Sequence, residues 1–237
     1  MITLAVVQPE LIGDSAHDAA AVLEACHAAS LRGVDLGVLP GVEAVSAEDA
    51  GRIELVEALN ELPGVWLLPR FECDSRGMAG IVPAPVELEG LATMALMVGD
   101  ACFDEQQLAR LAAADPDIAI LMPRSESELQ AEAVLEVALA LSDSLAGVVI
   151  VSEPYGAELG VPGHGGSAII RLGEIVCEAS DGPDLLVATV DTPIARPEPK
   201  EPLPAIPPIL SQRVSTHRGV RPSVDYPADL SGGFPPA

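Results

Sequence analysis

Lysine and aromatic side chains are scarce in this sequence. Aromatic residues make up 3% of its 237 residues, and Lys200 is the only lysine in the chain. Since hydrophobic residues still account for 49% of the chain, the core must be built mainly from Ala, Val, Leu and Ile. Small aliphatic side chains suit strands and helices that pack closely, as they do in α/β architectures.

Paired cysteines and histidines at metal-binding spacing are also missing. The four cysteines are scattered without a CxxC motif, at Cys26, Cys73, Cys102 and Cys177. This spacing gives no support for a zinc site or a disulfide framework. No Gly-x-Ser-x-Gly elbow, phosphate-binding loop or dinucleotide fingerprint occurs either. We therefore expect neither a metal nor a cofactor.

Positive charge is also scarce, and long apolar runs are absent. The formal net charge is −24, which repels nucleic acids and anionic membrane surfaces. No apolar run approaches the ~18 residues of a membrane-spanning helix. The first ten residues lack a basic leader region and are typical of a first strand. We expect a cytoplasmic protein with no nucleic-acid or membrane partner.

Hydrophobic periodicity predicts strands that alternate with helices. The expected strands are 2–8, 35–40, 65–69, 91–98, 118–123, 148–152, 167–171, 174–178 and 185–190. The expected helices start at Asp14, Ser46, Asp104 and Ser125. This alternation, with Leu172-Gly173 as a tight hairpin turn, indicates a mixed sheet packed by helices.

The last 46 residues differ in composition from the rest of the chain. Half of the 22 prolines fall within 192–237, and no hydrophobic period continues there. We expect one folded domain over 1–191 and a Pro-rich extended C-terminal arm over 192–237, either disordered or laid along a protein partner.

Six short segments follow one another in an informative order. They are Val-Gln-Pro at 7–9, Gly-Val-Asp-Leu-Gly-Val-Leu-Pro at 33–40, Ala-Cys-Phe-Asp at 101–104 with Gln-Leu-Ala-Arg at 107–110, and the segments 117–123, 148–156 and 166–174. In this order they resemble the motifs of the nitrilase (carbon–nitrogen hydrolase) superfamily across residues 2–191. The resemblance implies a four-layer α-β-β-α sandwich that usually forms a homodimer.

The same resemblance implies a catalytic set that this chain does not keep intact. The family uses a cysteine nucleophile, a glutamate base and a lysine that stabilises the oxyanion. By position, Cys102 matches the nucleophile. Gly41 follows Pro40 where the glutamate is expected, so Glu43 is the nearest candidate base. The matching site for the lysine falls near Pro85, far from Lys200.

Two interpretations of Cys102 remain open, a reactive thiol and a buried, inert one. Asp100, Asp104 and Glu105 surround it in sequence, and such carboxylates raise the pKa of a thiol. A register counted back from Arg110 even places Asp100 at the nucleophile position.

Other family positions depart as well. Glu153 replaces an asparagine of the family, and the Gly-rich residues 163–166 are typical of a flexible turn rather than an oxyanion loop.

Three functions are compatible with these residues. The leading hypothesis is a divergent nitrilase-like pseudoenzyme that acts as a binding or structural subunit through a homodimer surface or the arm. The second is an active amidase-type hydrolase that uses Cys102 and Glu43 in a rearranged site. The third is a small-molecule sensor or carrier that keeps the pocket without turnover.

Overall fold

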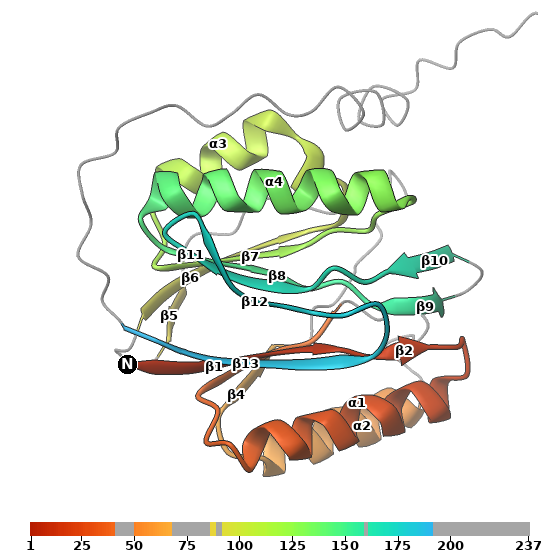
Figure 1. Cartoon of the computed structure of the whole chain (residues 1–237). Helices are drawn as coiled ribbons and strands as arrows, with labels where there is room; N and C mark the ends of the chain where they lie inside the picture. Colours follow the sequence, from red (N-terminus) through yellow and green to blue (C-terminus); the bar gives the residue numbers. More distant parts are fainter. Residues whose placement is uncertain (41–49, 68–85, 89–91, 159–160, 192–237) are drawn as a thin grey trace, which may run out of the picture.

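The computed structural model describes residues 1–40, 50–67, 86–88, 92–158 and 161–191. Two pairs of helices enclose two β-sheets between them, which gives four layers in the order α-β-β-α (Figure 1). The first outer layer holds α1 (Ser15–Ser30) and α2 (Ala50–Glu61), and the second holds α3 (Glu105–Ala114) and α4 (Glu128–Leu145). The predicted sandwich is confirmed.

The sheet next to α1 and α2 has the strand order β13-β1-β3-β4. Its strands are β1 (Ile2–Gln8), β3 (Leu36–Val38), β4 (Val65–Leu67) and β13 (Asp184–Val190). β1 runs parallel to β3 and antiparallel to β13, with Ile2 opposite Val190 and Gln8 opposite Asp184. The last described strand therefore lies beside the first.

The sheet next to α3 and α4 has the strand order β12-β11-β8-β7-β6-β5. Its strands are β5 (Val86–Leu88), β6 (Ala92–Val98), β7 (Ile118–Met122), β8 (Val148–Val151), β11 (Ala168–Arg171) and β12 (Glu174–Glu178). The central strands β6, β7 and β8 are parallel, so their carboxyl ends meet at one edge. The predicted hairpin joins β11 to β12, with positive φ angles of 52° at Leu172 and 76° at Gly173.

A small third sheet was not predicted from the sequence. It consists of β2 (Glu10–Leu11), β9 (Tyr155–Glu158) and β10 (Val161–His164) in the order β10-β9-β2. These strands have two to four residues, and β9 and β10 contain glycines, so they lack a readable alternation. The expected turn at 163–166 is consequently shorter, because Gly163 and His164 belong to β10 and only Gly165 and Gly166 form the turn.

Aliphatic side chains fill the space between the two large sheets. Both sheets contribute fully buried residues to this inter-sheet core, for example Leu4 and Val6 from β1 and Ile118 and Ile120 from β7. A second cluster lies between the larger sheet and α3 and α4, and a third packs α1 and α2 against β1. The apolar stripe predicted on the first helix is confirmed, since Val22 and Cys26 are fully buried there.

Side chains at the helix N-termini set three of the helix boundaries. Asp14 caps α1 and Asp104 caps α3, each accepting hydrogen bonds from two backbone N–H groups. The fourth predicted helix starts later than expected, because Ser127 and not Ser125 is its N-cap residue. The predicted cap Ser46 lies outside the described residues.

No helix in the described parts of the chain is long and apolar enough to span a membrane. The arm at 192–237 lies outside the described residues, and so does the segment 41–49 that contains Glu43.

The buried face of α4 should carry much of the stability of this fold. Replacing the fully buried Leu141 by Ala should lower the free energy of unfolding by about 2–5 kcal/mol, because it leaves a cavity against the sheet. The matched control is Leu129→Ala on the same helix, where the side chain is 54% exposed and the effect should stay within about 0.5 kcal/mol. Urea denaturation measures both, and equal losses would contradict this packing.

Candidate functional site

The carboxyl ends of five strands converge on one edge of the sandwich. β1 and β3 end there in one sheet, and β6, β7 and β8 end there in the other. Ligands of open α/β sheets bind outside the carboxyl ends of parallel strands, so this edge is the candidate site. Gln8 ends β1 at this edge, and Asp100, Ser125 and Glu153 lie just beyond β6, β7 and β8.

Gln8 connects the two large sheets at this edge. Its side chain is 1% exposed, and its Oε1 accepts a hydrogen bond of 2.9 Å from the backbone N–H of Ser167. Its Nε2 donates to the carbonyl oxygens of Gly182 at 2.6 Å and Ser180 at 3.1 Å. The middle residue of the family-like motif at 7–9 therefore has a structural role here, holding the start of β11 and the turn before β13.

A buried glutamate forms the centre of the same polar network. Glu153 is 2% exposed, and its carboxylate accepts hydrogen bonds from the backbone N–H of Ser125 at 2.8 Å and from its hydroxyl at 3.1 Å. The Ser167 hydroxyl donates to the Glu153 carbonyl at 2.9 Å and accepts from the Glu153 N–H at 3.0 Å. These bonds explain why Ser125 stays outside α4. The sequence marked Glu153 as a departure from the family but did not predict these partners.

Cys102 lies in the core and not in an open site. It belongs to a 3₁₀ helix, Gly99–Phe103, that follows β6, and its side chain packs in the cluster below α3 and α4. The residue is 1% exposed, and its thiol donates a hydrogen bond of 3.4 Å to the Met97 carbonyl. This environment is the one expected for a buried structural thiol.

The pKa of the Cys102 thiol is raised far above its ordinary value. Burial is the largest cause, followed by the negative charges of Glu153 and Asp100. The effect of Asp100 was expected from the sequence, whereas Glu153 is 51 residues away and comes close only in the fold. The same cause acts on Cys26, where burial raises the pKa to about 12. Both groups are thiols, not thiolates, at neutral pH.

The segment at 101–104 that resembles the nucleophile motif builds a turn. Gly99 has a φ of 59°, which ends β6 and redirects the chain. Phe103 is fully buried, and the carboxylate of Asp104 accepts from the N–H groups of Gln106 and Gln107. Phe103 and Asp104 therefore fill the core and cap α3. The candidate base Glu43 lies outside the described residues.

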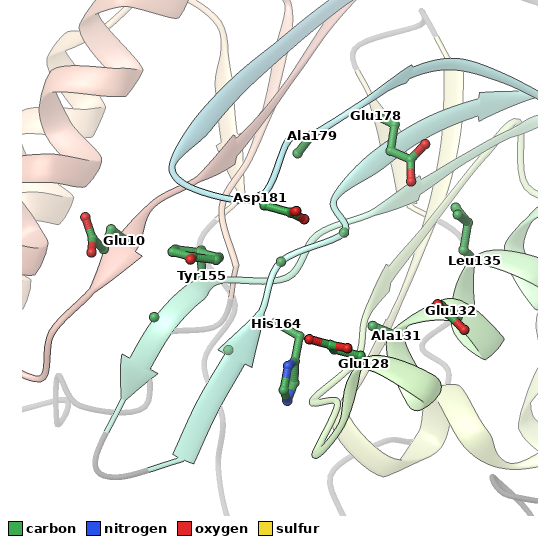
Figure 2. A pocket seen from close by; sticks show the side chains of 14 residues that line it. Glu10, Glu128, Ala131, Glu132, Leu135, Tyr155, His164, Glu178, Ala179 and Asp181 are labelled. Carbon is green, nitrogen blue, oxygen red and sulfur yellow. The ribbon is translucent and has the colours of Figure 1, made fainter.

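A cavity of about 790 Å³ opens beside the polar network (Figure 2). Gly165 and Gly166, which precede Ser167, form part of its lining. Its charged and aromatic lining residues are Glu10, Glu128, Glu132, Tyr155, His164, Glu178 and Asp181. In the described parts of the chain, no group of three or more His, Cys, Asp or Glu side chains is arranged to hold a metal ion.

Replacing Glu153 by Ala should destabilise the fold. The change leaves the buried N–H and hydroxyl of Ser125 without their acceptor, so we expect a loss of about 2–3 kcal/mol in the free energy of unfolding. The matched control is Glu136→Ala on the exposed face of α4, which should change stability by less than about 0.5 kcal/mol. Similar values for the two variants would show that the network contributes little.

Alkylation will report the state of Cys102 directly. At pH 8.5, we expect iodoacetamide to leave Cys102 and Cys26 unmodified in the folded protein and to label both in urea, since the raised pKa values apply only to the folded state. Cys177, which is only partly buried, serves as the internal comparison. Peptide mass spectrometry measures each site. Rapid labelling of Cys102 in the folded state would identify a reactive thiol.

Solved structures of an amidase share this fold, although the sequence comparisons find no relative. No protein-family model and no curated protein matches the chain. The amidase from Nesterenkonia sp. AN1 is 19% identical, with a TM-score of 0.61 over 81% of this chain and 94% of that chain. A cysteine-to-alanine mutant of this amidase, described as a member of the nitrilase superfamily, has 18% identity and a TM-score of 0.62 over 92% and 96% of the two chains.

A double mutant of the same amidase in complex with acrylamide is 19% identical and has a TM-score of 0.61 over 92% of this chain and 96% of that chain. These likenesses confirm the fold that the six sequence segments predicted. The chain therefore has the fold of this nitrilase-superfamily amidase.

Proposed function

We propose that this chain is a nitrilase-fold protein that does not hydrolyse amides through a cysteine nucleophile and that acts as a binding or structural subunit. The observation that carries the proposal is the environment of Cys102. A nucleophilic cysteine must be accessible and must form a thiolate near neutral pH. Cys102 is 1% exposed, and burial together with Glu153 and Asp100 raises its pKa.

The absence of a lysine from residues 1–199 supports the same proposal. A tetrahedral oxyanion needs a positive or strongly polar partner. Lys200 is the only lysine and follows β13, which completes the sandwich, by ten residues. The charges that act on the Cys102 thiol are instead the carboxylates of Glu153 and Asp100. They would oppose both the thiolate and the developing oxyanion.

The Nesterenkonia amidase differs from this chain in the setting of its active-site cysteine. One of its structures carries a covalent acetamide group at the active-site cysteine. A thiol that forms such an adduct must face a substrate pocket, whereas Cys102 belongs to a buried core cluster with Leu108 and Val151. An active hydrolase that used Cys102 with Glu43 would therefore need to rearrange the turn at Gly99–Phe103.

Ammonia release tests the lack of hydrolysis. Wild type and Cys102→Ala should both release no ammonia above background from a panel of amides, nitriles and carbamoyl compounds. Thermal stability, measured beside the assay, controls for folding of the variant. Activity in the wild type that Cys102→Ala abolishes would establish the hydrolase instead. A ligand that raises the melting temperature without being consumed would assign the chain to the small-molecule carriers.

Light scattering tests the subunit role in the same preparation. We expect a particle of at least twice the mass of the 24.4 kDa chain, because the fold family commonly forms homodimers. A monodisperse monomer at all concentrations would contradict a structural role through self-association.

A further inference from the structure

The basic residues of this chain are unevenly distributed. The arm at 192–237 contains five of the 12 lysines and arginines and four carboxylates, so the other 191 residues have a net charge of −25. Within the arm, residues 202–224 contain no carboxylate. They include the basic segment, which we define as residues 211–222, with Arg213, His217, Arg218 and Arg221.

The cavity beside the polar network has the opposite charge. Glu128 and Glu132 extend from one turn of α4, Glu178 ends β12, Asp181 lies between β12 and β13, and Glu10 lies in β2 (Figure 2). All five are exposed, and none of the described lining residues is Lys or Arg. Carboxylates that line a concave surface focus a negative potential and attract cations. Their distribution over three elements suits several separated cations rather than one metal ion.

We propose that the basic segment of the arm binds in this acidic cavity of the same chain. Guanidinium groups match carboxylates as forked donors and also stack on aromatic rings, which Tyr155 supplies in the lining. His164, whose Nε2 atom has no hydrogen-bond partner within the described residues, belongs to the same lining. The cavity volume of about 790 Å³ is sufficient for several side chains of a peptide.

The arm is long enough to reach the cavity. Val190 lies at the opposite end of β13 from Asp181, so the chain must return along a seven-residue strand, or about 23 Å. Twenty-one residues separate Asp191 from Arg213, and a chain of that length can span about 70 Å. Because the two partners are covalently joined, the effective concentration is on the order of millimolar, and weak individual contacts are enough.

The contact would be electrostatic and therefore sensitive to salt. Exposed ion pairs are individually weak, and the Debye length decreases from about 10 Å at 0.1 M salt to about 3 Å at 1 M. Binding of the segment would partly neutralise the charge of −25 on the rest of the chain. It would also cover the Gly165-Gly166 turn next to Ser167, and with it the side of the polar network that faces the cavity. This inference goes beyond the proposed function and does not depend on it.

Limited trypsin digestion of the full chain tests the contact. Trypsin can cleave after Arg213 and Arg218 in the basic segment, and after Lys200 as an internal reference outside it. In 20 mM salt, we expect cleavage after Arg213 and Arg218, relative to Lys200, to be about fivefold slower than in 0.5 M salt, since cleavage follows the population of the released segment. Mass spectrometry of the fragments measures the three rates, which should not depend on protein concentration.

Matched charge variants distinguish binding of the segment in the cavity from a general effect of the net charge. Glu128→Gln/Glu132→Gln/Glu178→Gln should abolish the protection at low salt. The control Glu24→Gln/Glu57→Gln/Glu61→Gln removes the same charge from exposed positions on α1 and α2, in the opposite outer layer (Figure 1). This control variant should retain the protection at low salt. Equal cleavage in wild type and the cavity variant, or equal loss of protection in both variants, would overturn the proposal.

Hydrogen exchange gives a second readout on the cavity side. Neutralising the segment with Arg213→Gln/Arg218→Gln/Arg221→Gln should speed exchange in residues 155–166, because the segment covers the β9–β10 hairpin in the wild type. Exchange in α1 should not change. Unchanged exchange at 155–166 would also overturn the proposal.

Discussion

Close aliphatic packing between the two large sheets is the constraint on which the rest of this structure depends. With 3% aromatic residues, the inter-sheet core contains Val, Ile, Leu and Ala side chains in place of large rings. Small side chains bury enough surface only when the sheets approach closely and in one register. Any polar group at the rim of such a core must find a partner, because an unpaired buried group costs about 1–3 kcal/mol.

The polar network at the carboxyl edge follows from this constraint. Gln8 satisfies groups of β11 and of the turn before β13, and Glu153 satisfies the N–H and hydroxyl of Ser125. In an active member of this fold family, the same edge would present catalytic groups to a substrate. Here the described residues use their hydrogen-bonding capacity on one another. The carboxylate of Glu153, where the resemblance places the family's asparagine, bonds to groups of the protein itself and makes the edge more negative.

The position of Cys102 connects this packing to function. Cys102 belongs to the 3₁₀ helix at Gly99–Phe103 that follows β6. In this chain the thiol faces the core, in the same buried cluster as Leu108 and Val151. By contrast, the carboxylates around the cavity at the β9–β10 hairpin are exposed. These features therefore support a binding role more directly than a catalytic role.

The sequence predicted most of the elements that have a clear hydrophobic period. β1, β6, β7 and β8 were expected within one or two residues, as was α1 with its cap at Asp14. It did not predict the β2-β9-β10 sheet, because strands of two to four residues carry no readable period and are held by pairing with distant segments. Nor could it choose between a reactive and a buried Cys102, since local sequence reports neighbouring carboxylates but not burial.

By itself, the sequence determined the α/β class, the order of the strands and helices along the chain, the missing lysine and the uneven distribution of charge. These properties depend on residue type and on local periodicity, which are present before folding. The tertiary structure alone decided that Cys102 lies in the core, that Glu153 bonds to Ser125 across 28 residues, and that carboxylates from three separate elements line one cavity. Burial and proximity between distant segments arise only when the two sheets pack together.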